Sequence, residues 1–332
     1  MKLRIIPLFL LALLSACSKG QKDTAASATN AQPAVEVPDF NADSAYSYVN
    51  RQVSFGSRVP NTEAHRLCAA YLAGELRRHG ATVTEQTAEV SAYDGTNLHI
   101  TNLIGSYAPE NPIRILLCAH WDSRPWADAD PDEKNHRKPI LGANDGASGV
   151  GVLLELARMI HQKAPRVGVD LILFDAEDYG LPQWEDRSSD PNAGESTWCL
   201  GSQYWATHPH VENYMPRYGI LLDMVGGEKA TFYKEGYSID FAAAIVEKVW
   251  SQAAAAGYAE YFIDGHSGYV TDDHLFVNRL AHIPCIDIIP ADLQNGGFSP
   301  VWHTLKDDMS AISAATLKAV GQTVAAVIYH EQ

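Results

Sequence analysis

The chain has few basic residues and few cysteines, and both shortages narrow what it can do. Its 25 lysines and arginines are outnumbered by 40 aspartates and glutamates, which gives a net charge of −15. A surface this negative repels nucleic acid and anionic lipid, so we expect no polyanionic partner. None of the five cysteines has the spacing of a thiolate metal site. Metal ligands are therefore to be sought among imidazoles and carboxylates.

An apolar run at the N-terminus has the features of an export signal. Lys2 and Arg4 precede apolar residues 5–14, a run too short to span a membrane as a mature helix. Residues 14–17 resemble the bacterial lipobox, which implies diacylation at Cys17. A plain signal peptide with an incidental cysteine is the alternative. We expect residues 1–17 to be a lipoprotein signal peptide and the protein to be an exported bacterial lipoprotein, anchored on the periplasmic side.

The remaining chain divides into a tether and one domain. Residues 18–38 are rich in Ala, Thr, Ser, Gln and Lys without apolar periodicity, which predicts a disordered tether. Residues 39–332 contain no internal repeat and have the length of a single large α/β domain. We expect one catalytic domain there, touching the membrane only through its lipid anchor, and we favour a monomer. No disulfide pairing can be read for the other four cysteines, Cys68, Cys118, Cys199 and Cys285.

Short apolar runs with polar residues behind them dominate this domain. They cover residues 113–119, 169–174, 219–222 and 284–289. Between them, residues 63–79, 149–163, 239–256 and 312–330 have helical character, and residues 82–90 and 97–104 have the pattern of antiparallel edge strands. This alternation predicts a three-layer α/β/α sandwich around a mixed, mostly parallel sheet, with a polar crevice at the carboxyl ends of the strands. Residues 125–139 are charged and bounded by prolines, which predicts a surface loop.

Residues able to bind a divalent metal follow these runs. They are His120, Asp145, Asp178, Asp223 and His303. Imidazole and carboxylate without thiolate suit a catalytic zinc site, and Glu177, beside Asp178, suits a general acid/base. Taken singly, each residue has an ordinary structural interpretation, such as a helix cap for Asp145 in its glycine-rich turn. Their common position after successive predicted strands favours one site.

Six motifs in this order resemble the zinc-exopeptidase family M28, from about residue 40 to the C-terminus. They lie at residues 119–123, 142–149, 174–178, 222–223, 272–274 and 301–304. Within that family the chain is most similar to glutaminyl cyclases of the animal-like type, including bacterial members. Those enzymes place a tryptophan before the last metal histidine, as in Trp302-His303, and paired aspartates before a histidine, as in Asp272-Asp273-His274. The aminopeptidases of the family typically have Ser-Asp-His at the latter place.

The resemblance implies an activity and a set of roles. The reaction would cyclise an N-terminal glutamine of peptides or proteins to pyroglutamate with release of ammonia. One zinc ion per chain would be held by Asp145, Asp178 and His303. Glu177 would move the proton, supported by Asp223 and Asp272. The substrate pocket would include His120, Trp302 and a loop tryptophan, for which we choose Trp184, with Trp198 the alternative. That loop, residues 181–197, is expected to overhang the crevice.

One departure from the animal enzymes and two competing functions remain open from the sequence alone. The animal enzymes have Glu where this chain has Asp178, which is one methylene shorter. A zinc aminopeptidase would use His120 and Asp223 as additional metal ligands, and every ligand for two metals is present. A catalytically silent peptide-binding lipoprotein is the third hypothesis, against which the intact base and ligands argue.

Overall fold

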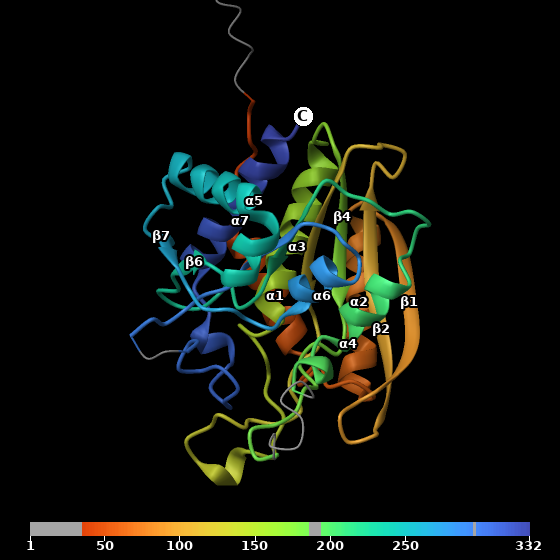
Figure 1. Ribbon diagram of the computed structural model, residues 1–332, viewed down its shortest axis with the longest axis vertical. Helices are drawn as coiled ribbons and strands as arrows, with labels where there is room; N and C mark the ends of the chain where they lie inside the picture. The colour runs from red at the N-terminus through yellow and green to blue at the C-terminus, as the bar shows by residue number, and fades with distance from the viewer. Residues whose placement is uncertain (1–34, 186–193, 295–296) are drawn as a thin grey trace, which may run out of the picture. The chain divides into compact units, whose positions relative to one another are not determined.

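The computed structural model describes residues 35–185, 194–294 and 297–332, and Val35–Gln332 forms one compact unit (Figure 1). Cys17, nearly all of the expected tether and residues 186–193 of the expected overhanging loop lie outside the described residues. Within the described part, no helix combines the length and the apolar character needed to cross a membrane.

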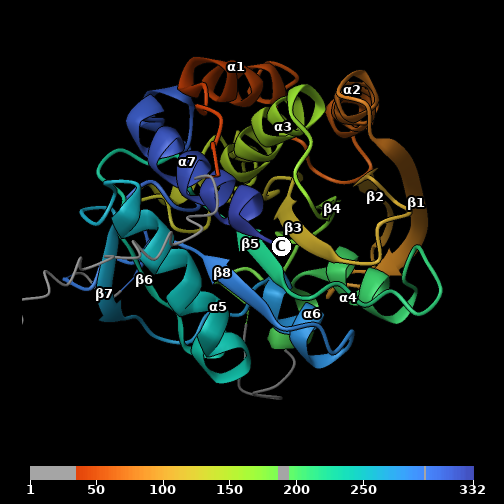
Figure 2. The same cartoon turned by 90° about the horizontal axis from the view of Figure 1, so that it is seen from above.

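A six-stranded sheet with the order β1-β2-β4-β3-β5-β8 forms the middle layer (Figure 2). Its strands are β1 (Thr82–Ser91), β2 (Asn97–Tyr107), β3 (Arg114–His120), β4 (Gly168–Phe174), β5 (Gly219–Leu222) and β8 (Cys285–Ile288). β1, β2 and β4 pair antiparallel, whereas β4, β3, β5 and β8 are parallel neighbours. β6 (Phe232–Lys234) and β7 (Phe262–His266) form a separate two-stranded sheet. The carboxyl ends of the four parallel strands therefore meet at one edge.

Helices cover both faces of the sheet, so every residue of β4 is buried. One face carries α1 (Ala42–Val53), α2 (Glu63–Arg78), α3 (Ala147–Gln162) and α7 (Ala314–His330), and the other carries α4 (Leu200–Thr207) and α6 (Asp273–Arg279) (Figure 2). α5 (Gly236–Ala255) packs against β8 and α7. Successive β3 side chains alternate between the two layers, since Leu117 joins the core of α3 and Leu116 joins the core of Trp205. The predicted α/β/α sandwich is confirmed.

Most helices lie where apolar periodicity predicts them. α2, α3, α5 and α7 all form close to the expected residues, although α5 contains a non-helical residue, Ala242, with φ −145°. α4 and α6 are not expected from the sequence because they span only 8 and 7 residues, too few for a helical period to repeat clearly. Three short 3₁₀ helices, η1 (Glu133–Asn135), η2 (Glu195–Thr197) and η3 (Met309–Ala311), complete the described elements. The four cysteines after Cys17 are free and buried.

Gly149 sets how closely α3 approaches the sheet, and it offers a test of this packing. A Cβ atom at Gly149 would collide with the carbonyl oxygen of Leu222 at the end of β5. We expect Gly149→Ala to lower the free energy of unfolding by about 1–3 kcal/mol, the usual cost of overpacking. Gly74→Ala is the matched control, because a Cβ atom at that helical glycine would have no neighbouring atom within 4 Å. Denaturant unfolding of both variants measures the difference, and equal stability would contradict the close approach.

Candidate active site

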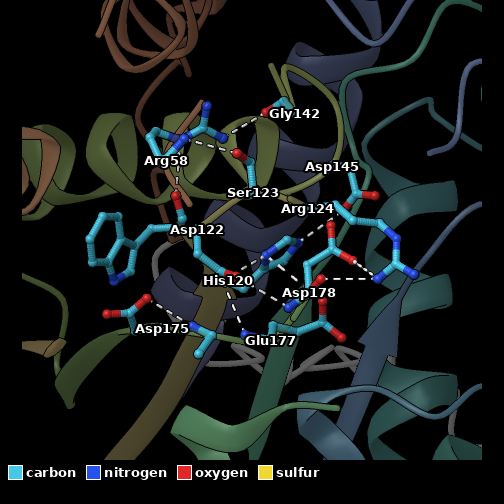
Figure 3. A network of polar contacts seen from close by, with 12 residues as sticks. Arg58, His120, Asp122, Ser123, Arg124, Gly142, Asp145, Asp175, Glu177 and Asp178 are labelled. Carbon is cyan, nitrogen blue, oxygen red and sulfur yellow. Dashed lines mark hydrogen bonds and ion pairs between the residues drawn. The ribbon is translucent and has the colours of Figure 1, made fainter. Parts of the chain in front are cut away.

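The carboxyl ends of the parallel strands bring the predicted site residues together, and Figure 3 shows His120, Asp145 and Asp178 among them. His120 is the last residue of β3, Asp223 follows β5, and Asp178 follows β4 after a short turn. Asp145 comes from the turn before α3, and His303 comes from the segment between β8 and α7. All five are buried, with relative exposures between 1% and 6%. The sequence therefore places the metal-binding residue types in one crevice, as predicted.

The turn after β4 orients the two acidic residues that follow it. Ala176 has a left-handed backbone, with φ 51°, which an L-residue adopts only where its surroundings enforce it. The carboxylate of Asp122 accepts the backbone N–H of Glu177 at 3.1 Å and that of Asp178 at 3.2 Å (Figure 3). Asp175 instead accepts hydrogen bonds from the backbone N–H of Thr101 at 2.6 Å and lies 2.9 Å from His65 Nε2. The turn thus directs Glu177 and Asp178, but not Asp175, to the crevice.

The turn before α3 leaves the Asp145 side chain available. Gly146, with φ 94°, is the N-cap residue of α3, and no side chain caps this helix. A Cβ atom at Gly146 would lie 2.6 Å from the carbonyl oxygen of Asp122, so glycine is needed there. The backbone N–H groups of Asn144 and Asp145 donate to the carboxylate of Asp307 at 2.7 and 3.0 Å. Asp145 is therefore not a helix cap, and its carboxylate faces the other site residues.

Asp145, Asp178 and His303 form the first potential metal group. Their ligand atoms lie within 4.8 Å of one another. His303 Nε2 is 3.6 Å from Asp145 Oδ2 and 3.3 Å from Asp178 Oδ1. Among the described residues, Asp145 Oδ2 and Asp178 Oδ2 are buried without a hydrogen-bond partner. Two carboxylates and one imidazole with unpartnered oxygens fit a divalent metal such as zinc.

His120, Asp145 and Asp223 form a second group that shares Asp145 with the first. His120 Nε2 lies 3.1 Å from Asp145 Oδ1 and 3.2 Å from Asp223 Oδ1. Burial lowers the pKa of His120, but the surrounding carboxylates outweigh burial and raise that pKa well above its usual range. His120 thus lies beneath the crevice as a bridge between carboxylates and is not part of the pocket lining. This group also has the residue types to hold a metal.

Glu177 lies beside the metal group and is held by different partners. Its Oε1 accepts a hydrogen bond from Cys199 Sγ at 3.3 Å, and both residues lie close to Asp272. Burial raises the pKa of Glu177 well above that of an exposed glutamate. Burial and the nearby charge of Asp223 raise the pKa of Asp272 to about 7. Asp272 is thus able to exchange a proton near neutral pH beside Glu177.

A cavity of about 480 Å³ opens onto these residues. Its lining includes Asp145, Glu177, Asp178, Gly194, Glu195, Trp198, Asp223, Met224, Tyr269, Val270, Thr271, Asp272, Ile289, Phe298, Trp302 and His303. The rings of Trp302 and Trp198 stack on His303 from centroid distances of 3.7 and 6.0 Å. Trp184, the first choice from the sequence, instead contacts Trp126 and His136 and does not line this cavity. The alternative, Trp198, occupies the pocket wall.

The sequence did not reveal several residues that support the site. Cys199 contacts Glu177, Asp122 positions the turn after β4, and Arg124 and Asp128 contact two residues of the first metal group. The sequence predicts a surface loop at residues 125–139, but residues 125–130 are buried or half-buried, including Asp128 at 3% exposure. In the sequence, the only hint of this arrangement is that Arg124 and Asp128 are four residues apart and can form a local ion pair. Most ion pairs of this kind lie on protein surfaces, so the spacing alone does not predict burial.

The known proteins that this chain resembles include peptidases and glutaminyl cyclases. The sequence profile described as Peptidase family M28 matches residues 102–328. The solved structure of Bacteroides thetaiotaomicron glutaminyl cyclase bound to N-acetylhistamine is 59% identical, with TM-score 0.87 over 90% of this chain and 100% of that chain. A structure described as a leucine aminopeptidase precursor from the same organism is also 59% identical, with TM-score 0.86 and the same coverages. Glutaminyl-peptide cyclotransferase of Drosophila melanogaster is 25% identical over 283 residues, 78% of this chain and 73% of that protein.

Proposed function

The chain belongs to peptidase family M28, and we propose that it acts as a glutaminyl-peptide cyclotransferase, which converts an N-terminal glutamine to pyroglutamate and releases ammonia. The observation that carries this function is the 59% identity, over 90% of the chain, to a glutaminyl cyclase. The crevice supports it, because a buried glutamate lies between a potential metal group and an aromatic pocket. The substrates are peptides or proteins with an N-terminal glutamine.

The residues in the crevice suit the parts of this reaction. One zinc ion per chain, held by Asp145, Asp178 and His303, would polarise the side-chain amide carbonyl of the substrate as a Lewis acid. Glu177 accepts a proton from the attacking α-amine and returns it to the departing ammonia. The raised pKa of Glu177 makes its carboxylate a stronger base than an exposed glutamate.

Other residues hold the substrate and limit water. Asp223 and Asp272 line the cavity beside Glu177 and keep the exchanged proton within the carboxylate group. Trp302 and Trp198 wall a pocket for one side chain, which brings the α-amine close to the amide carbon for closure of a five-membered ring. A ring closure of this kind needs no water molecule as nucleophile.

A zinc aminopeptidase is the second candidate function, and one observation favours it. Asp145 is shared by the two potential metal groups, so it could bridge two ions if His120 and Asp223 held the second. A peptide with N-terminal glutamine and a matched peptide with N-terminal leucine separate the two functions, when ammonia and free amino acid are measured together. We expect ammonia and pyroglutamate from the first peptide and no free leucine from the second. Release of leucine without ammonia from glutamine would establish the aminopeptidase instead.

Membrane anchoring is a separate proposal that rests on the N-terminal sequence alone. Cys17 in its lipobox-like setting would carry the lipid and hold the enzyme on the periplasmic side. We expect Cys17→Ser to yield soluble or unprocessed protein with unchanged activity, because the tether expected at residues 18–38 would separate the anchor from the domain. Fractionation of cells expressing either form measures this. Equal membrane retention of both forms after signal processing would contradict lipidation.

A further inference from the structure

We infer that Arg124 and Asp128 are positioning residues that hold two of the three proposed zinc ligands in place. The inference rests on the zinc site of the proposed function. Arg124 lies in the segment after β3, and its side chain is 1% exposed, while that of Asp128 is 0% exposed. A buried charge is costly unless it is paired and its hydrogen-bonding groups are satisfied. The pair contacts two proposed zinc ligands, Asp178 and His303, and these contacts are the reason to assign it a positioning role.

The guanidinium of Arg124 fixes Asp178 through both its main chain and its side chain. Nη1 donates to the carbonyl oxygen of Asp178 at 3.0 Å and to its Oδ1 at 3.3 Å (Figure 3). The same nitrogen lies 3.5 Å from the carbonyl oxygen of Gly180. Asp178 Oδ2 is left without a partner among the described residues. Arg124 thus orients the carboxylate so that one oxygen stays free for a metal.

Asp128 connects the same guanidinium to His303. Arg124 donates to it in bidentate fashion, from Nε to Oδ1 at 2.8 Å and from Nη2 to Oδ2 at 2.6 Å. Asp128 Oδ1 lies 3.2 Å from His303 Nδ1. This nitrogen is buried and has no hydrogen bond of ordinary geometry among the described residues, so its contact with Asp128 is electrostatic. A carboxylate on Nδ1 keeps that nitrogen protonated and leaves the Nε2 lone pair for the metal.

The guanidinium of Arg124 has a third neighbour besides Asp178 and Asp128. The guanidinium carbon also lies 4.6 Å from the ring centroid of Trp198, which forms the pocket wall. A single cation therefore supports a carboxylate ligand, an imidazole ligand and the aromatic wall. Loss of its charge would leave Asp128 buried without compensation next to His303.

The experiment compares this pair with a similar pair remote from the crevice. Arg114 on β3 and Asp170 on β4 also form a bidentate pair, with N–O distances of 2.8 and 2.7 Å. Arg114 opens β3 and His120 closes it, so this control lies at the opposite end of the strand. Asp128→Asn and Arg124→Lys are the test variants, and Asp170→Asn is the control.

For each full-length variant, three properties are measured. They are the zinc dissociation constant by chelator competition, the visible spectrum after loading with Co²⁺, and the melting temperature without metal. We expect Asp128→Asn to weaken zinc binding about 10–100-fold and to alter the Co²⁺ spectrum. Arg124→Lys keeps the positive charge but loses the bidentate contact with Asp128, and we expect it to weaken zinc binding less. Asp170→Asn lowers the melting temperature and leaves zinc binding and the spectrum unchanged.

Unchanged zinc affinity in the folded Asp128→Asn and Arg124→Lys proteins would overturn the inference. Equal weakening by Asp170→Asn would also overturn it, because the effect would then be one of general stability. If Asp128→Asn does not fold, Arg124→Lys alone decides. Cyclisation by the unmutated protein is measured alongside: a chain that binds zinc but does not cyclise glutamine contradicts the proposed function and leaves the positioning role intact.

Discussion

Glu177→Gln is expected to keep its zinc and its fold while turnover falls by roughly two or more orders of magnitude, the usual scale for a positioned acid/base. Glutamine has the shape of glutamate, and its amide oxygen can still accept the hydrogen bond that Cys199 Sγ donates at 3.3 Å. It cannot, however, take a proton from the attacking amine. Substrate affinity should change much less, because the aromatic walls and the proposed zinc ligands are untouched.

Pyroglutamate formation, substrate affinity and zinc content measured on one preparation test this prediction together. Glu155→Gln is the matched control, since Glu155 is also buried but pairs with Arg158 on α3 and does not line the cavity. We expect that variant to lose stability and to retain turnover. Near-normal turnover in a zinc-replete Glu177→Gln protein would exclude the proposed role. The base would then have to be sought in Asp223 or Asp272.

The sequence predicts the sheet and the metal-binding residue types because both follow from local patterns. The apolar runs at residues 113–119, 169–174 and 219–222 become β3, β4 and β5, and the parallel order brings His120, Asp178 and Asp223 to one edge. The run at residues 284–289 becomes β8 in the same way. Because both faces of the sheet are buried, its central strands are apolar throughout. The polar residues that can take part in catalysis therefore lie just after the strands end.

The choice between loop tryptophans depends on tertiary structure and could not be made from the sequence. Trp184 lies in the insertion at residues 181–197 and Trp198 directly follows it, and nothing in the local pattern says which of the two turns toward the crevice. Trp198 is placed by its neighbour Cys199, whose left-handed backbone, with φ 58°, starts α4 beneath Glu177. Trp184 instead packs against the guanidinium of Arg137, whose central carbon lies 4.7 Å from the centroid of the Trp184 ring.

How the short side chain of Asp178 is positioned can also be seen only in the structure. From the sequence, replacing the Glu of the animal enzymes by Asp requires the metal or the strand end to shift. The structure shows a left-handed residue at Ala176 and a guanidinium from Arg124 on Asp178. Arg124 directly precedes residues 125–139, and the charged composition of that segment does not indicate that Arg124 and Asp128 are buried. Composition reports the average exposure of a segment, whereas a site depends on individual side chains that fold inward.

His303→Ala is expected to remove the zinc and the activity together. Zinc bound by two carboxylates and one neutral imidazole is balanced in charge, and His303 supplies the imidazole. Without it, Asp145 and Asp178 would face each other as a buried pair of carboxylates with no nitrogen ligand. Because His303 is a proposed ligand, its loss should weaken zinc binding by more than the 10–100-fold typical of residues that only support a ligand.

Zinc content by elemental analysis and turnover of a glutamine peptide are compared in His303→Ala, in the unmutated chain and in His79→Ala. His79 is a buried histidine at the end of α2 that hydrogen-bonds to Tyr48 Oη at 2.9 Å, so its loss should reduce stability without changing zinc content. We expect about one zinc per unmutated chain, as three ligands with one open position predict. Two tightly held zinc ions, both needed for turnover, would instead assign His120 and Asp223 as ligands, because they share Asp145 with the first group. That result would favour the aminopeptidase, in which a water molecule rather than the substrate's own amine is the nucleophile.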